Sequence, residues 1–145
     1  MERGPTILGN LSHIAFVVRD LDAAVAKFES VLGARLLERE YLAAAETEVA
    51  LLEVGGAQFE LLSSPAPNSR IGRILAEKGE GIHHVSFNVN GIESKMGEMR
   101  ATGIRLLDAA PRTGAHGRRI AFVDPAETCG IQFEMVEEPP SHRRE

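Results

Sequence analysis

The sequence predicts an α+β fold in which two tandem βαβββ modules form a curled, mixed β-sheet. The main observation is an internal repeat, because three segments recur in the same order: 11–18 with 82–89, 33–38 with 103–108, and 57–62 with 131–136. Ordered self-similarity of this kind indicates a duplicated structural unit. A chain of 145 residues has the size of one domain. We therefore expect a single domain over 1–145, made of two repeats at about 10–64 and 81–138.

The first repeat supports this order element by element. Alternating polarity predicts a strand over 11–18, and apolar residues at helical spacing predict a helix over 21–32. Asp20 or Asp22 can cap the start of this helix, and Gly33 can end it in the left-handed region. Further strands are expected over 34–42, 47–54 and 57–63.

The second repeat follows a connecting segment, which we expect to be a loop over 63–69 and a short helix over 69–78. A strand is predicted over 82–89. A helix is predicted over 92–102, because its apolar residues form one stripe at helical spacing. The stretch AAPRTGAHG at 109–117 is rich in turn residues and is expected to be a loop. The remaining strands are predicted over 104–108, 118–123 and 130–137.

Composition excludes several classes of function. The net charge is −5 and the basic residues are scattered, which argues against nucleic-acid binding. No apolar segment approaches the ~20 residues that span a bilayer, and the N-terminal residues lack the pattern of a signal peptide. The single cysteine, Cys129, excludes an intramolecular disulfide. We interpret it as a packed small residue in a cytoplasmic protein.

Polar side chains on the matched strands indicate a candidate site. Successive strand residues point to opposite faces, so His13 and His84 stand opposite the large apolar residues of their strands. Glu60 and Glu134 do the same in the last strand of each repeat. Each repeat therefore offers one His and one Glu to one face of its sheet. His83 points to the apolar face and is interpreted as a structural or rim residue.

Two interpretations of these four residues are open. Taken singly, a strand His is usually a hydrogen-bonded structural residue, and a strand Glu is usually solvated. The matched placement in both repeats favours a metal site, because two carboxylates and two neutral imidazoles neutralise a divalent cation. This nitrogen and oxygen set suits Mn, Co, Ni, Zn or Fe better than Ca, and it lacks the thiolates of structural zinc sites. A six-coordinate ion would keep two positions for a substrate with two oxygens.

Longer motifs give the chain a family resemblance. The most specific are GEGIHHVSFNV (79–89) and GAHGRRIAFVDP (114–125) followed by GIQFEM (130–135), while SHIAFVVRDLDAAVAKFESVLG (12–33) is more general. Over about residues 10–138 the chain resembles the vicinal oxygen chelate (glyoxalase) superfamily and, within it, the methylmalonyl-CoA epimerases. The resemblance implies a cup of two βαβββ modules around a divalent metal, with cobalt favoured over Mn, Ni or Zn. It also implies a homodimer that acts on an acyl-CoA.

The resemblance implies metal ligands at His13, Glu60, His84 and Glu134. It further implies that two glutamates exchange the substrate α-proton. One is Glu134, and the other lies in the strand TEVALLEV, where Glu48 is the best match and Glu46 and Glu53 are the alternatives.

The implied reaction is metal-dependent epimerisation of (R)- and (S)-methylmalonyl-CoA, with the α-proton removed and returned through a metal-stabilised enolate. A glyoxalase I-type lactoylglutathione lyase uses similar ligands and stays open, as does a non-enzymatic small-molecule-binding member of the superfamily. A ring-cleaving dioxygenase is a weaker alternative. In the loop 111–119, Arg112, Arg118 or Arg119 either helps to hold the acyl-CoA or is a solvated residue of a connector.

Overall fold

The computed structural model describes residues 8–138. Its helices and strands are β1 (Leu11–Val17), α1 (Leu21–Leu32), β2 (Arg35–Leu42), β3 (Thr47–Val54), β4 (Ala57–Ser63), α2 (Arg70–Lys78), β5 (Gly81–Asn88), α3 (Ile92–Ala101), β6 (Arg112–Thr113), β7 (Arg119–Phe122) and β8 (Phe133–Glu137). Backbone contacts divide the described chain into two compact units, residues 13–84 and residues 8–12 with 85–138. Within residues 8–138, every helix is too short or too polar to cross a bilayer.

The strands are hydrogen-bonded in the order β2-β3-β4-β1-β5-β8-β7-β6. β1 is parallel to β4 and β5 is parallel to β8, whereas the pairs β2–β3, β3–β4, β6–β7 and β7–β8 are antiparallel. The order βαβββ occurs twice, once from β1 to β4 and once from β5 to β8, with α2 between them. The predicted α+β class, the mixed sheet and the duplicated βαβββ order are confirmed.

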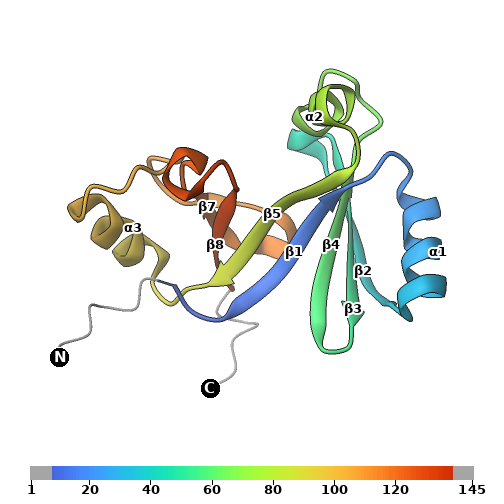
Figure 1. Cartoon of the computed structure of the whole chain (residues 1–145), viewed down its shortest axis with the longest axis horizontal. Coiled ribbons are helices and arrows are strands. Elements are labelled where there is room, and N and C mark those ends of the chain that lie inside the picture. The colour runs from blue at the N-terminus through green and yellow to red at the C-terminus, as the bar shows by residue number, and fades with distance from the viewer. Residues whose placement is uncertain (1–7, 139–145) are drawn as a thin grey trace. The chain divides into compact units, whose positions relative to one another are not determined.

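In the unit 13–84, α1 packs on one face of the strands (Figure 1). The helix begins after Asp20, whose carboxylate accepts a hydrogen bond from Ala23 N at 3.0 Å, and it ends at Gly33 with φ 67°. Asp20 is therefore the cap among the two predicted candidates. Burial of apolar surface stabilises this layer, and its buried members are Val18, Leu21, Ala24, Val25, Ala34, Ala50, Leu52 and Leu61.

The helix α2 connects the two repeats close to its predicted place. Ser69 caps it by accepting a hydrogen bond from Gly72 N at 2.9 Å. The preceding loop approaches the first turn so closely that a Cβ on Gly72 would lie 2.2 Å from the carbonyl oxygen of Ala66. Glycine at this position therefore allows the loop to pack against the helix.

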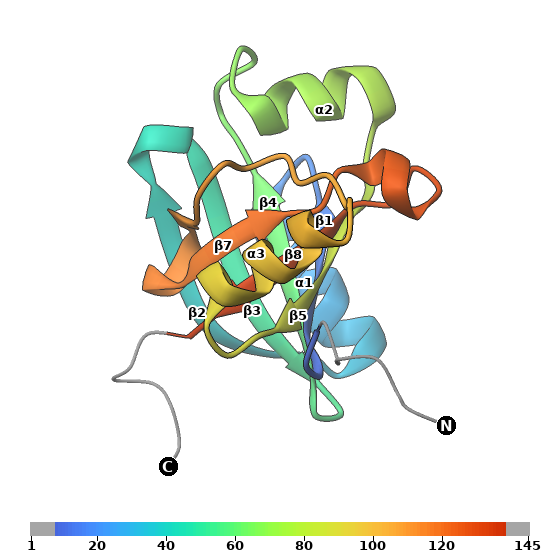
Figure 2. The same ribbon diagram turned by 90° about the vertical axis from the view of Figure 1, so that its left-hand side faces the viewer.

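In the second unit, α3 lies against β7 and β8 (Figure 2). The buried residues of this layer are Val89, Ile92, Met96, Met99, Ala121, Val123 and Met135. Gly91 precedes α3 and provides no side-chain cap. Glu137 on β8 supplies the missing acceptor, because its Oε2 accepts a hydrogen bond from Ile92 N at 2.9 Å.

The second repeat differs from prediction in one strand. The strand expected over 104–108 is reduced to an isolated bridge between Leu106 and Val123, and β6 lies inside the segment expected to be a loop. Asp108 explains the change. Its carboxylate accepts hydrogen bonds from Phe122 N and Arg112 Nε, both at 2.7 Å, so a side chain replaces the backbone acceptor that a continuing strand would offer.

Candidate metal centre

The parallel pairing of β1 with β4 brings the first His and Glu together. Glu60 is the direct partner of Ala15, and His13 lies two residues before Ala15 on the same face. His13 is 1% exposed and Glu60 is 4% exposed. His13 Nε2 and Glu60 Oε2 lie 3.8 Å apart, which is too far for a hydrogen bond. A cation that binds both atoms fits this separation.

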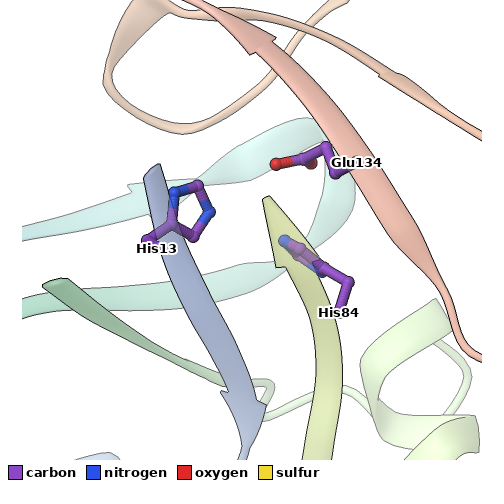
Figure 3. Close-up of side chains that lie close together, drawn as sticks. All are labelled: His13, His84 and Glu134. Carbon is purple, nitrogen blue, oxygen red and sulfur yellow. The ribbon is translucent and has the colours of Figure 1, made fainter. Parts of the chain in front are cut away.

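The second imidazole joins this pair within the unit 13–84. His84, on β5, is 4% exposed. Its ring meets the ring of His13 edge-on, with centroids 5.7 Å apart and an interplanar angle of 74°. The two rings offer nitrogen atoms within 4.8 Å of each other, and Figure 3 shows both rings with a nitrogen directed into the same space.

The character of these donors fits a divalent transition metal. His13, Glu60 and His84 combine two imidazoles with one carboxylate, all buried. A buried carboxylate needs a positive partner or hydrogen-bond donors to offset its desolvation, and an ion on the His side of Glu60 would serve as that partner. Imidazole and carboxylate together suit Zn, Co, Ni, Mn or Fe.

Glu134 stands on β8 in the other unit and is 4% exposed (Figure 3). Its direct partner on β5 is Ser86, which is completely buried and donates a hydrogen bond from Oγ to Glu134 Oε1 at 2.5 Å. The equivalent pair in the first repeat is Ala15 and Glu60, and Ala15 has no donor. Glu134 is therefore oriented by its cross-strand neighbour, whereas Glu60 is not. Ser86 was not predicted as a site residue. Its position two residues after His84, which places both side chains on the same face of the strand, could have identified it.

His83 contacts the neighbouring His84 despite the alternation of strand side chains. The two Nδ1 atoms lie 2.6 Å apart, and the rings are nearly perpendicular, with centroids at 4.9 Å. At this distance one Nδ1 carries the hydrogen and the other accepts it. If His84 is the donor, its Nε2 keeps the lone pair that a metal requires.

The structure does not bring Glu48 to the ligand face. The register pairs Glu48 with Ser63 on β4 and pairs Leu51 with Glu60. Partners in register point to the same side and neighbours alternate, so Glu48 and Glu60 point to opposite faces. Glu48 lies on the α1 side, where it lines a shallow groove with Leu21, Arg39 and Tyr41 that reaches Glu40 at the strand edge. A role for Glu48 as second base stays a prediction, and its position on the α1 side does not support that role.

The three arginines expected near the acyl-CoA have different surroundings. Arg112 Nε lies 2.7 Å from Asp108 Oδ1. Arg119 donates to Glu93 at 2.6 Å, and this hydrogen bond is the main cause that raises the pKa of Arg119. Arg118 is only 4% exposed and donates to the carbonyl oxygen of Ala115. Acyl-CoA binding by these residues stays a prediction.

Comparisons with known proteins agree with this fold. Residues 12–122 match the family described as the glyoxalase/bleomycin resistance protein/dioxygenase superfamily. The chain is 31% identical to the mitochondrial methylmalonyl-CoA epimerase of Homo sapiens over 129 residues, which cover 88% of this chain and 73% of that protein.

Two solved structures are also similar. The methylmalonyl-CoA epimerase of Mycobacterium tuberculosis has a TM-score of 0.88 and 28% identity, covering 97% of this chain and 95% of that one. A Streptomyces coelicolor methylmalonyl-CoA epimerase variant in complex with 2-nitronate-propionyl-CoA has a TM-score of 0.84 and 29% identity, covering 90% and 98%. The resemblance predicted from the sequence motifs is confirmed, as is the isomerase class of enzyme.

Proposed function

Because the chain belongs to the glyoxalase/bleomycin resistance protein/dioxygenase superfamily, we propose that it epimerises (R)- and (S)-methylmalonyl-CoA with the help of a divalent metal. The proposed ligands are His13, Glu60, His84 and Glu134. Cobalt is the first metal to test, followed by Mn, Ni and Zn. We also propose that the enzyme is a homodimer in the cytoplasm.

The observation that carries this proposal is the buried group of His13, Glu60 and His84. His13 Nε2 and Glu60 Oε2 are 3.8 Å apart, a separation that a cation bound to both atoms fits. Inclusion of Glu134 is supported by the register, because Ser86 follows His84 by two residues on β5 and pairs directly with Glu134. Duplication of the strand pattern supports one His and one Glu from each repeat.

The reaction requires a lower pKa for the α C–H group, whose carbon lies between a thioester and a carboxylate. When bound, the metal would act as a Lewis acid that neutralises negative charge developing on the substrate oxygens. Glu134 would take the α-proton or return it, as a carboxylate or a carboxylic acid according to the epimer bound. The hydroxyl of Ser86 holds Oε1 of Glu134, so Oε2 is the oxygen proposed to exchange the proton. Burial of these groups would keep water from competing for it.

The test combines metal analysis with two assays. The protein would be stripped with a chelator, reloaded with Co or Mn, and assayed with (R)-methylmalonyl-CoA and with methylglyoxal plus glutathione. We expect metal-dependent formation of the (S) epimer and no consumption of the glutathione adduct. Turnover of the adduct alone would support the lyase alternative. A protein that binds no metal and turns over neither substrate would support a binding protein.

A further inference from the structure

We propose that His83 is a positioning residue of the metal centre. Its Nδ1 accepts a hydrogen bond from Nδ1 of His84, and this bond fixes the tautomer in which His84 Nε2 can bind a metal. The inference rests on the proposed function, because it takes His84 as a ligand. Both residues lie on β5 within the unit 13–84.

The contact between the two rings is close and specific. Their Nδ1 atoms are 2.6 Å apart, and the rings meet at an interplanar angle of 75°. Nδ1 is bonded to Cγ, the ring atom nearest the backbone, so neighbouring residues on opposite faces of a strand can still bring these two atoms together. Two lone pairs at this separation would repel each other, and two hydrogens would collide. A single hydrogen therefore lies between the two nitrogens.

This contact leaves Nε2 as the nitrogen that His84 can offer to a metal. The Nδ1 atom is already engaged by His83. The His84 ring meets the ring of His13 edge-on, and a nitrogen of each is directed into the same space (Figure 3). His84 Nε2 is also shielded from solvent. Whether Nε2 carries a hydrogen or a lone pair therefore decides whether His84 can be a ligand.

The direction of the hydrogen bond sets the state of Nε2. A neutral imidazole has one N–H group, and the hydrogen bond at one nitrogen determines which nitrogen carries it. If His84 Nδ1 donates, its Nε2 keeps a lone pair. If His83 donates instead, the hydrogen of His84 lies on Nε2 and blocks the ligand atom. Neutral histidine in water favours the hydrogen on Nε2, so the metal-binding tautomer needs an acceptor at Nδ1.

The internal repeat indicates that the strand itself does not require a histidine at position 83. The matched residue in the first repeat is Ser12, which precedes His13 in the same kind of strand. An imidazole therefore precedes the proposed ligand in the second repeat alone. Partners of this kind that orient a ligand histidine are a general feature of metal sites.

The first test reads the tautomers directly in the metal-stripped protein. Histidine labelled with ¹⁵N would be observed in a long-range ¹H–¹⁵N correlation spectrum at about pH 8, well above the ordinary histidine pKa of about 6.5. We expect His84 to carry its hydrogen on Nδ1 and His83 to carry its hydrogen on Nε2. A hydrogen on Nε2 of His84 would overturn the inference.

The second test compares three variants by tautomer and by cobalt affinity. His83→Leu removes the acceptor, so the hydrogen of His84 should move to Nε2 and the Kd for cobalt should rise about 10–100-fold. His83→Asn places its Oδ1 at a similar distance from the backbone as Nδ1 and should restore the tautomer and most of the affinity. Val85→Ala is the matched control, because Val85 is also half-buried and lies two residues further along β5 on the same face as His83. It should change neither the tautomer nor the Kd.

Three results with these variants would overturn the inference. They are a wild-type Kd in His83→Leu, an equal loss of affinity in Val85→Ala, and an equal loss in His83→Leu and His83→Asn, which would make His83 itself a ligand. Failure of the proposed function is distinguishable from all of these. A wild-type protein that binds no cobalt, or that binds it without epimerising methylmalonyl-CoA, refutes that function, whereas the tautomer of His84 is read without metal or substrate.

Discussion

Replacement of Ser86 by Ala should loosen Glu134 without opening the core. Ser86 is completely buried, and the change removes only its hydroxyl, which donates to Glu134 Oε1 at 2.5 Å. A hydrogen bond to a charged group contributes about 1.5–3 kcal/mol to stability. Glu134 makes further interactions in the fold, so we expect a loss of about 2 kcal/mol. For a chain of this size, that corresponds to a fall in Tm of roughly 4–8 °C.

The same variant should bind metal more weakly. Removal of a side chain that orients a metal ligand typically lowers metal affinity about 10–100-fold. Thermal unfolding followed by circular dichroism measures the first effect, and titration of the stripped protein with cobalt measures the second. Ser94→Ala is the control, because Ser94 is exposed on α3 and should change stability by less than about 0.5 kcal/mol. A Ser86→Ala protein with wild-type Tm and wild-type cobalt affinity would refute the role of this hydrogen bond.

Three further predictions concern the ligands and the core. Addition of cobalt at about 100 times its Kd should stabilise the metal-stripped wild-type protein by about 2.7 kcal/mol, which corresponds to a rise in Tm of roughly 5–11 °C. The His84→Ala variant should show almost no rise in Tm. A rise equal to that of the wild type would exclude His84 as a ligand. Leu61→Ala, at a completely buried position against α1, should cost about 2–5 kcal/mol in urea unfolding, and a cost below 1 kcal/mol would contradict this packing. Gly72→Ala should lower the stability of the protein, because its Cβ would lie 2.2 Å from Ala66 O. The control Gly97→Ala in α3 meets nothing within 4 Å and should raise the stability by up to about 1 kcal/mol. Equal effects of the two changes in thermal unfolding would contradict the close approach at Gly72.

Alternation along a strand was informative where one face is clearly polar. It placed His13, Glu60 and Glu134 on the faces where the structure has them, because large apolar residues mark the opposite face of each strand. Glu48 lies in a strand where this criterion fails. In TEVALLEV, apolar residues occupy both faces, and the four from Val49 to Leu52 are all buried. The pattern could not show which side faces α1.

Interactions that depend on the conformation of individual side chains were also beyond prediction. The strand expected over 104–108 is interrupted by a hydrogen bond from Phe122 N to the Asp108 side chain. The contact between His83 and His84 depends on the rotation of both rings. Propensity and periodicity describe local preference, and neither contains this information.

The two large helices differ in when their first turns can be completed during synthesis. Asp20 caps α1 from the adjacent residue, so this helix has its acceptor as soon as Ala23 has been made. The acceptor for Ile92 N in α3 is Glu137, 45 positions later in the chain. On the ribosome, α1 can therefore complete its first turn early, whereas the first turn of α3 lacks this acceptor until Glu137 has left the exit tunnel.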